Sequence, residues 1–582
     1  KIFCFRLFSL YRGMWRYTSL WDMFNIIKAN SLSSFIIVLY ASLSIGFDHI
    51  SRSVFFIDYF LCLGFISTSR LGIRMFFTHF IEVLKTDNKT INRKKILLIG
   101  GGDSGQNIVR QTLQNSYSSL SIIGILDDDI KKIRSKIHGI PILCSISELN
   151  NLNIEYNEIY IAIPSATRKE LRRIVEFCKL TKKPFKTLPS INELIEGKVS
   201  ISQFREVSVI DLLGRKEIIL DKNSISGFLK GKRILVTGAG GSIGSELVRQ
   251  CIKFNPSVLL MLDISELNLF EIDREVSLIK SNILSKPILS DIRDISALEN
   301  IFAEFKPQIV FHAAAYKHVP MQEKFPWEAV KTNIFGTINL SKISVKNNVE
   351  KFVLVSTDKA VKPTNVMGAT KRLAEIIIQD SGNKQDDTEF MAVRFGNVLG
   401  SSGSVIPIFQ EQIKNGGPIT ITNPEMERFF MSIPEASQLI LQAGGLGRGG
   451  EIFILDMGKT VKIIDLASEL IRLSGFEPGV DIAIEITGSR PGEKIIEELS
   501  LPTENLDKTK HEKIFVLNSR ISNNLFNNIT SEILRKKDEL VKENLSTVKL
   551  ALSNILDDYS PMNNLNNKKY RNEDEKELDA KA

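Results

Sequence analysis

Three glycines in one short stretch have the spacing of a dinucleotide-binding turn. Residues 234–236 read as a buried strand, and the glycine stretch leads from this strand into a helix. Gly238 permits the tight turn, Gly241 lets the backbone approach a pyrophosphate, and Gly244 lets the helix pack closely on the strand. The amides at the start of the helix then face the phosphates, aided by the helix dipole. The predicted cofactor contacts of this turn are Gly238, Gly241, Ser242, Ile243 and Gly244.

Acidic residues follow the next two predicted strands. Asp263 closes the strand over 258–262, where a carboxylate binds a ribose 2′-hydroxyl. Because a carboxylate at this point repels a 2′-phosphate, NAD is favoured over NADP. Asp291 and Ile292 follow the third strand, and there they would flank the adenine. The alternative is a glycine-rich turn that binds nothing, but the strand, the helix and the acid together favour a cofactor site.

A second candidate site lies after another apolar strand. Asp358 and Lys359 stand side by side directly after the strand over 352–355. Functional groups of α/β proteins gather at the carboxyl ends of parallel strands, so this position is suited to a reaction site. The alternative is an ordinary surface Asp–Lys pair at the end of a strand.

The elements around these residues predict two α/β domains with doubly wound, Rossmann-like parallel sheets. The first spans about 90–190, with strands over 96–99, 122–126 and 158–163 and a glycine turn at 100–105. Nothing catalytic accompanies that turn, so a structural or regulatory role without a nucleotide is equally consistent. The second domain spans 231–500. We expect residues 191–230, which include the stretch 211–215, to be a connector, and residues 501–582 to be helical (526–557) and then disordered.

Residues 1–80 predict a partial transmembrane helical region in front of the two domains. Two apolar runs, 35–47 and 54–67, are separated by a loop with Asp48, His49 and Arg52. Arginines and lysines precede and follow the pair, so the positive-inside rule places both ends in the cytoplasm. Two buried helices of a soluble domain are the alternative, which Asp58 favours. Because Lys1 is not a methionine start, we expect a truncated N-terminus.

Composition excludes several classes of protein. The net charge of +8 is modest for 582 residues, and the basic side chains are spread out rather than clustered with aromatic residues, so no nucleic-acid groove is expected. Nucleotide phosphates are the better anionic partner. The five cysteines form no CxxC motif, which argues against a metal site or a disulfide framework and fits a reducing, cytoplasmic setting.

Six short motifs together resemble one known family. They lie at 237–244, 312–320, 356–360, 365–371, 394–398 and 490–494. This set resembles the polysaccharide-biosynthesis family of membrane-anchored UDP-N-acetylglucosamine 4,6-dehydratases, within the extended short-chain dehydrogenase/reductases. The resemblance covers nearly all of residues 90–500. The family usually has four spanning helices, so about half of that region is expected to be missing here.

The resemblance implies a redox-neutral reaction. NAD takes hydride from sugar carbon 4, a base removes the carbon-5 proton, water leaves from carbon 6, and the hydride returns to carbon 6. Lys359 is then the expected base and Asp358 the expected acid, with pKa values shifted by a closed, desolvated site. Lys371 would hold the nicotinamide ribose. Met367 stands where most relatives in the superfamily have a tyrosine, so the group that removes the carbon-4 hydroxyl proton stays open; Thr357 could relay it through water.

The resemblance also implies further contacts and partners. Ala313 and Ala315 would line the cofactor, and a UDP-N-acetylhexosamine would bind to Lys317, Asn397, Arg428, Arg490 and Glu493, since a guanidinium fork suits phosphate oxygens. Each of these residues alone has a second interpretation as an ordinary ion-pair or capping residue. We expect a homodimer at the cytoplasmic face of a bacterial inner membrane. The competing hypotheses are a nucleotide-sugar 4-epimerase, which Met367 disfavours, and a non-catalytic, NAD-sensing membrane scaffold.

Overall fold

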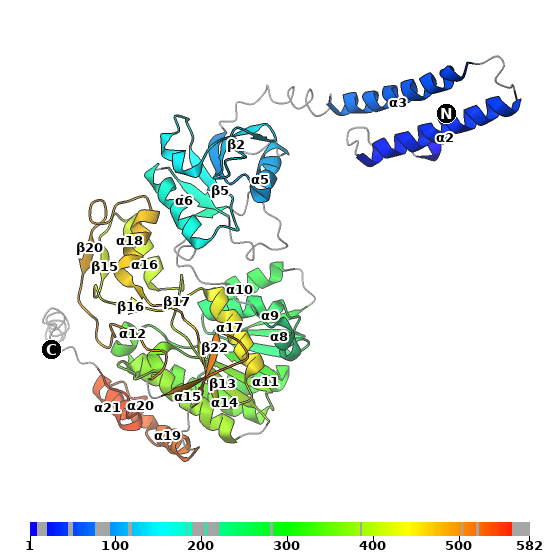
Figure 1. Ribbon diagram of the computed structural model, residues 1–582. Coiled ribbons are helices and arrows are strands. Elements are labelled where there is room, and N and C mark those ends of the chain that lie inside the picture. Colours follow the sequence, from blue (N-terminus) through cyan, green and yellow to red (C-terminus); the bar gives the residue numbers. More distant parts are fainter. Residues whose placement is uncertain are drawn as a thin grey trace. The chain divides into compact units, whose positions relative to one another are not determined.

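The computed structural model describes most of the chain, in separate parts (Figure 1). The described residues are 1–8, 20–44, 51–75, 93–114, 119–181, 183–188, 204–206, 220–279, 283–384, 387–501, 504–518 and 523–561. Asp48 and His49 of the predicted loop, the stretch 211–215 and the tail from 562 lie outside these ranges.

Two long apolar helices dominate the N-terminal part. The helices are α1 (Ile2–Leu7), α2 (Leu20–Ser44) and α3 (Arg52–Met75). Within α2 and α3, Met23–Ser44 and Arg52–Ile73 are each long and apolar enough to cross a membrane. They lie side by side (Figure 1), and the Asn30 side chain donates to the Tyr59 carbonyl at 3.0 Å. Large apolar side chains such as Phe65, 82% exposed, point away from this contact.

The small α/β domain has a seven-stranded sheet in the order β3-β4-β2-β1-β5-β6-β7. Its central strands are parallel, and β3 and β7 pair antiparallel at the edges. The first strand is flanked on one side by the second and on the other by the fifth, which is the doubly wound arrangement that the sequence predicts. The elements are β1 (Lys94–Ile99), α5 (Asp103–Gln114), β2 (Leu120–Leu126), β3 (Lys136–Ile137), β4 (Ile140–Cys144), β5 (Glu158–Ile161), α6 (Arg168–Leu180), β6 (Phe185–Thr187) and β7 (Arg205–Glu206).

The large domain is built on a nine-stranded sheet in the order β10-β9-β8-β11-β12-β13-β18-β22-β21. Seven strands run parallel, and β22 and β21 add an antiparallel edge. Chain order reverses between β8 and β11, where α/β sheets bind their ligands. The strands are β8 (Arg233–Thr237), β9 (Val258–Asp263), β10 (Leu284–Leu289), β11 (Ile309–His312), β12 (Lys351–Val355), β13 (Glu389–Arg394), β18 (Glu451–Leu455), β21 (Asn505–Lys508) and β22 (Ile514–Asn518).

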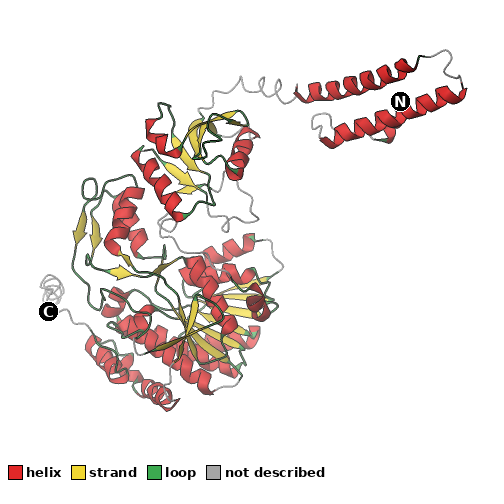
Figure 2. Ribbon diagram, viewed as in Figure 1, coloured by secondary structure: helices red, strands yellow, loops and turns green. Residues whose placement is uncertain are grey.

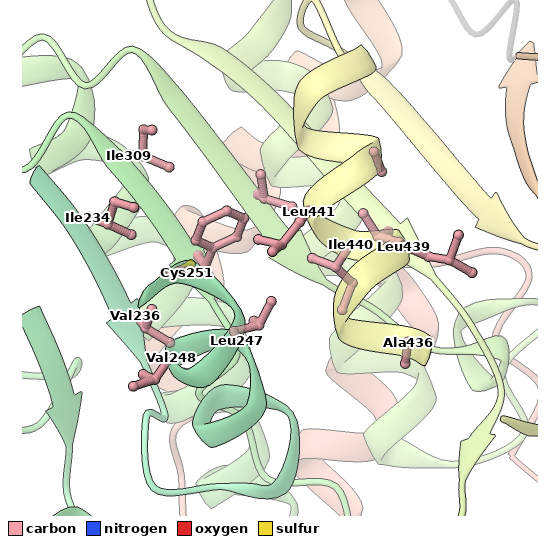
Figure 3. Packing of buried hydrophobic residues seen from close by; sticks show 14 of the residues in the cluster. Ile234, Val236, Leu247, Val248, Cys251, Ile309, Ala436, Leu439, Ile440 and Leu441 are labelled. Atoms are coloured by element: carbon pink, nitrogen blue, oxygen red, sulfur yellow. The ribbon is translucent and has the colours of Figure 1, made fainter. Parts of the chain in front are cut away.

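Helices cover both faces of this sheet (Figure 2). On one face, α9 (Ser242–Ile252) packs on β8 and β9, α17 (Ile433–Leu446) packs on β12, β13 and β18, and α8 (Lys222–Leu229) packs on α17. Figure 3 shows Leu247 and Val248 of α9 and Leu439 to Leu441 of α17 in this layer. The other face is covered by α11 (Ile295–Phe305), α14 (Thr337–Lys346) and α15 (Val366–Lys384). Burial on both faces explains why the central strands are continuous apolar runs.

Shorter elements complete the large domain. Between the strands lie α10 (Glu266–Leu278), α12 (Val319–Lys324), α13 (Pro326–Ala329), a π-helical turn (Val330–Gly336) and a 3-10 turn (Asp358–Ala360). A smaller part with its own apolar core contains β14 (Asn397–Val398), α16 (Val405–Lys414), β15 (Ile419–Ile421), β16 (Glu427–Arg428), β17 (Phe430–Met431), β19 (Val461–Lys462), α18 (Ile463–Leu473) and β20 (Ile484–Ile486). The stretch predicted as one C-terminal helix forms α19 (Asn523–Arg535), α20 (Lys537–Leu540) and α21 (Leu545–Ile555), which pack on α13 and α15.

A buried ion pair ties the carboxyl end of the sheet to α15. Arg394 at the end of β13 is 1% exposed, and its guanidinium meets the buried Glu375 carboxylate at 2.8 Å. The Ser356 hydroxyl, just past β12, donates to the same carboxylate at 2.7 Å. Burial raises the pKa of Glu375, but attraction to Arg394 and Arg372 outweighs burial and lowers that pKa to about 2. The pair therefore holds two strand ends and one helix together.

Glu375→Gln should destabilise the fold by about 3–5 kcal/mol, because it leaves the Arg394 charge buried without its partner. The folded-state pKa of Glu375 lies below the ordinary value, so the contribution of the pair is present above about pH 4.5 and is lost as pH falls toward 2. Denaturant titration at several pH values measures this. Glu299→Gln, which removes the exposed partner of Lys346, is the control and should cost under about 1 kcal/mol. Equal losses in the two variants would contradict the account.

Candidate active site

The glycine turn between β8 and α9 has the geometry that the spacing predicts. Gly238 has φ +66°, in the region that favours glycine. A Cβ atom on Gly244 would lie 1.9 Å from the Gly238 carbonyl oxygen, so α9 can approach the turn only because residue 244 has no side chain. A Cβ on Gly238 would lie 2.7 Å from the Ala314 amide nitrogen. The segment that follows β11, which includes Ala313, therefore packs directly against the turn. The helix begins at Ser242, with Ile243 following.

Asp263 is fixed beside this turn. Its carboxylate accepts the Gly240 amide at 2.8 Å and the Ser265 amide at 2.8 Å. Each carboxylate oxygen has a further lone pair, which suits the two hydroxyls of a ribose. Asp291 lies two residues beyond β10, which pairs in parallel with β9, and its carboxylate is held by the Arg293 guanidinium. The predicted cofactor residues thus follow the carboxyl ends of three neighbouring parallel strands, β8, β9 and β10.

Asp358 and Lys359 form a hydrogen-bonded couple at the end of β12. The Lys359 ammonium donates to Asp358 Oδ1 at 2.9 Å and to Asn397 Oδ1 at 3.0 Å. Asp358 is fully buried and the Lys359 side chain is 16% exposed. The Thr357 hydroxyl donates to Asp358 Oδ1 at 3.0 Å and also accepts the Lys359 amide at 3.4 Å, which caps the short turn. The couple is therefore an internal pair and not a surface Asp–Lys pair.

The charge of Lys359 differs from the sequence expectation of a neutral amine. Burial lowers the pKa of Lys359, but the neighbouring Asp358 and Glu497 carboxylates outweigh burial, and the pKa is raised overall. Lys359 therefore rests as an ammonium. The 2.9 Å hydrogen bond connects this ammonium directly to the Asp358 carboxylate.

Helix α15 presents Met367 and Lys371 one helical turn apart, on the same face. Both are buried, at 4% and 6% exposure. Burial lowers the pKa of Lys371 to about 8, with a smaller opposing effect from Glu375. A Cβ on Gly368 of the same turn would lie 2.2 Å from the Lys359 carbonyl oxygen, so α15 packs directly on the Asp358–Lys359 couple. The structure thus brings the two motifs together.

The predicted substrate contacts divide into two groups. Asn397 accepts from Lys359, and the Arg428 guanidinium is buried, donating to the backbone carbonyls of Glu427, Lys494 and Ile495. Its Nη2 lies 4.0 Å from the Glu493 carboxylate. By contrast, Arg490 and Lys317 are exposed, and Glu493 also accepts the Arg490 amide at 3.1 Å. Arg428 is thus largely engaged with backbone, whereas Arg490 and Lys317 are exposed residues.

Sequence reasoning missed Glu497. Its carboxylate is 4% exposed and lies 3.8 Å from the Lys359 ammonium. Proximity in sequence could not reveal this contact, because the two residues come from distant segments. The signal in the sequence was the position of this glutamate, shortly after the 490–494 motif. A charge so close to the expected site has to be either buried or paired.

The small α/β domain repeats two features of the glycine turn. The Gly101 amide donates to Asp127 Oδ2 at 2.7 Å, as the Gly240 amide does to Asp263. A Cβ on Gly105 would lie 2.0 Å from the Gly100 carbonyl oxygen, the same close approach of helix and turn.

In the described ranges, no group of three or more His, Cys, Asp or Glu side chains is gathered as for a metal ion.

Comparisons with known proteins match most of the chain. A family model described as "Polysaccharide biosynthesis protein" matches residues 234–519, and one described as "CoA-binding domain" matches residues 6–184. The capsular polysaccharide biosynthesis protein CapD of Staphylococcus aureus is 42% identical over 513 residues, which are 88% of this chain and 84% of that protein. A UDP-glucose 4-epimerase of Rickettsia canadensis is 37% identical over 274 residues, 46% of this chain and 77% of that protein. The X-ray structure of Pen from Bacillus thuringiensis is 36% identical, covers 51% of this chain and 92% of its own, and has a TM-score of 0.47.

Gly244→Ala should destabilise the large domain by about 1–3 kcal/mol, because its methyl group would overlap the Gly238 carbonyl. Thermal unfolding of the purified chain measures this loss. Gly227→Ala is the matched control: it lies within α8 with open space around it, and should leave stability unchanged or raise it by up to about 1 kcal/mol. A Gly244→Ala variant as stable as the control would show that the turn is looser than described.

Lys371→Met should remove the part of the pH dependence of stability that comes from burial of the Lys371 ammonium. The folded-state pKa of Lys371, about 8, lies below its ordinary value of 10.5, so the folded state disfavours the ammonium. Stability of the wild type relative to the variant should therefore rise by up to about 3 kcal/mol as pH increases from 8 to 10.5. Melting curves of the two proteins at several pH values test this, and parallel curves would contradict the burial of the charge.

Proposed function

The chain belongs to the polysaccharide biosynthesis protein family, within the extended short-chain dehydrogenase/reductase superfamily, and on this premise we propose that it is an NAD-dependent 4,6-dehydratase of UDP-N-acetylglucosamine or a close UDP-N-acetylhexosamine. The observation that carries the proposal is the buried Asp358–Lys359 couple, on which the turn of α15 with Met367 and Lys371 packs directly.

The cofactor-binding residues fit this proposal. The turn at Gly238–Gly244 would hold the pyrophosphate, and Asp263 would accept from the ribose hydroxyls, which selects NAD over NADP. NAD supplies the hydride acceptor and donor of the reaction when it is bound. The ammonium of Lys371 would hold the nicotinamide ribose and favour loss of the carbon-4 hydroxyl proton. Thr357 would bind that hydroxyl.

The Asp358–Lys359 couple is able to supply both proton transfers of a dehydration and return to its starting state. Transfer of the Lys359 proton to Asp358 creates a neutral amine and a protonated carboxyl in one step. Lys359 then takes the carbon-5 proton, and Asp358 gives its proton to the departing carbon-6 hydroxyl. The products of this step are water, an ammonium and a carboxylate. Once hydride has been added at carbon 6, the Lys359 ammonium returns a proton to carbon 5, and the proton released earlier from the carbon-4 hydroxyl restores the ammonium, so no outside acid or base is consumed.

The second candidate is a nucleotide-sugar 4-epimerase. The relative from Rickettsia canadensis that is named UDP-glucose 4-epimerase favours it. Against it, epimerisation depends on a proton-transferring tyrosine at the position of Met367, and a thioether exchanges no proton. The third hypothesis, a non-catalytic NAD-sensing scaffold, does not explain why an Asp358–Lys359 couple is buried at the carboxyl end of the central strand β12.

Helices α2 and α3 would anchor the enzyme. Their length, their apolar composition and the large exposed apolar side chains along them support two membrane spans. With arginines and lysines at both ends of the pair, the α/β domains would lie at the cytoplasmic face of a bacterial inner membrane. There the enzyme would act on a soluble nucleotide sugar, as a homodimer, for assembly of a surface polysaccharide or glycan.

Incubation of the full chain with NAD and UDP-N-acetylglucosamine in deuterated water should yield a 4-keto-6-deoxy sugar with deuterium at carbon 5, read by NMR. Deuterium enters because Lys359 exchanges its protons with solvent before the sugar is reprotonated. Lys359→Ala should lower the rate by about 10²–10⁴-fold.

Each other product has a distinct meaning. UDP-N-acetylgalactosamine would identify the epimerase, and unchanged substrate would favour the scaffold. A Lys359→Ala variant that exchanges carbon 5 at the wild-type rate would refute the assignment of Lys359 as the base.

A further inference from the structure

Glu497 is held in a fixed place beside the reaction site. The segment that carries it is bonded to Arg428, whose guanidinium donates to the carbonyls of Lys494 at 2.7 Å and Ile495 at 2.9 Å. The Glu427 amide donates to the Ile495 carbonyl at 3.0 Å. The backbone just before Glu497 is therefore held in place by these bonds.

The Glu497 carboxyl is close to two cations without being hydrogen-bonded to either. Its Oε1 lies 3.8 Å from Lys359 Nζ and 4.0 Å from Arg428 Nη2, both longer than a hydrogen bond. Its Oε2 is buried and, within the described part of the chain, has no hydrogen-bond partner. A buried carboxylate with so few hydrogen bonds is costly, so the protonated and ionised forms are both accessible states of this group.

Four charged groups face Glu497, and their effects on its pKa oppose one another. Burial raises the pKa of Glu497, Lys359 lowers it, Asp358 raises it, and Arg428 and Lys494 lower it. The result is a raised pKa, so Glu497 keeps its proton to higher pH than an exposed glutamate does.

We propose that Glu497 is a positioning residue that decides whether Lys359 is able to pass its proton to Asp358. Ionised Glu497 places a second negative charge 3.8 Å from the ammonium and stabilises Lys359 in its charged, non-basic form. Protonated Glu497 leaves Asp358 as the one carboxylate beside the ammonium, and transfer of the proton from Nζ to Oδ1 of Asp358 then costs less free energy. This inference rests on the proposed function and adds a control over the state of its base.

Glu497→Gln tests the proposal, because glutamine keeps the volume of protonated glutamate and stays neutral at every pH. Keto-sugar formation by the full chain with NAD is followed across pH. At low pH the wild type and the variant should have similar rates. As pH rises, the rate of keto-sugar formation by the wild type should fall by up to about tenfold per pH unit relative to the rate of the variant. Glu498→Gln, at the neighbouring partly exposed position, should follow the wild type throughout. If the Glu497→Gln variant does not fold, the Glu497→Met variant, which is also neutral at this position, is measured in its place.

Two outcomes would overturn the proposal. A neutral variant that is about tenfold or more slower at every pH, with Glu498→Gln normal, would mean that the site needs the negative charge. Coincident pH profiles of wild type and variant would mean that Glu497 does not act on Lys359.

A wild type that forms no keto sugar would defeat the proposed function, and melting temperatures then test separately whether Glu497 ionises with a raised pKa, which the proposal requires. The folded-state pKa of Glu497 lies above the ordinary value, so its contribution to stability is present at low pH and lost as pH rises through the folded-state pKa. The Tm of the wild type should therefore fall relative to Glu497→Gln over that range. A constant Tm difference would overturn the proposal.

Discussion

An ammonium and a carboxylate buried side by side at the end of β12 impose the main constraint on this protein. Asp358 is fully buried and Lys359 is largely buried, so each charge depends on the other, with Asn397 and Thr357 as additional partners. The couple keeps its place because β12 and β13 are in register and the Arg394–Glu375 pair fastens both strand ends to α15. The close approach at Gly368 then puts Lys371 within the same site. Stability and chemistry are thus tied to the same few contacts.

The local parts of this arrangement could be predicted from the sequence. The Gly238–Gly244 turn and the acid at Asp263 were predicted because a strand, a tight turn and a helix N-terminus follow one another along the chain. Nearly continuous apolar strands alternating with helices predicted a parallel sheet covered on both faces, and the structure has this sheet. The Asp358–Lys359 couple could be placed at a strand end for the same reason.

The remaining parts depend on contacts between distant segments. Glu497 reaches Lys359 because a late loop folds back over the sheet edge, and no local spacing encodes that contact. Arg428 was expected to bind phosphate, but its guanidinium also holds the backbone of that loop. The charge on Lys359 likewise could not be predicted, because burial and two carboxylates act in opposite directions and only the three-dimensional arrangement decides which is larger.

The central claim is that one enzyme-bound hydride leaves carbon 4 of the sugar and returns to carbon 6. UDP-N-acetylglucosamine with deuterium at carbon 4, incubated with the full chain and NAD in ordinary water, tests it most directly. The account predicts a product whose carbon-6 methyl group carries that deuterium, within the same molecule. Deuterium found again at carbon 4, or lost from the sugar altogether, would contradict it.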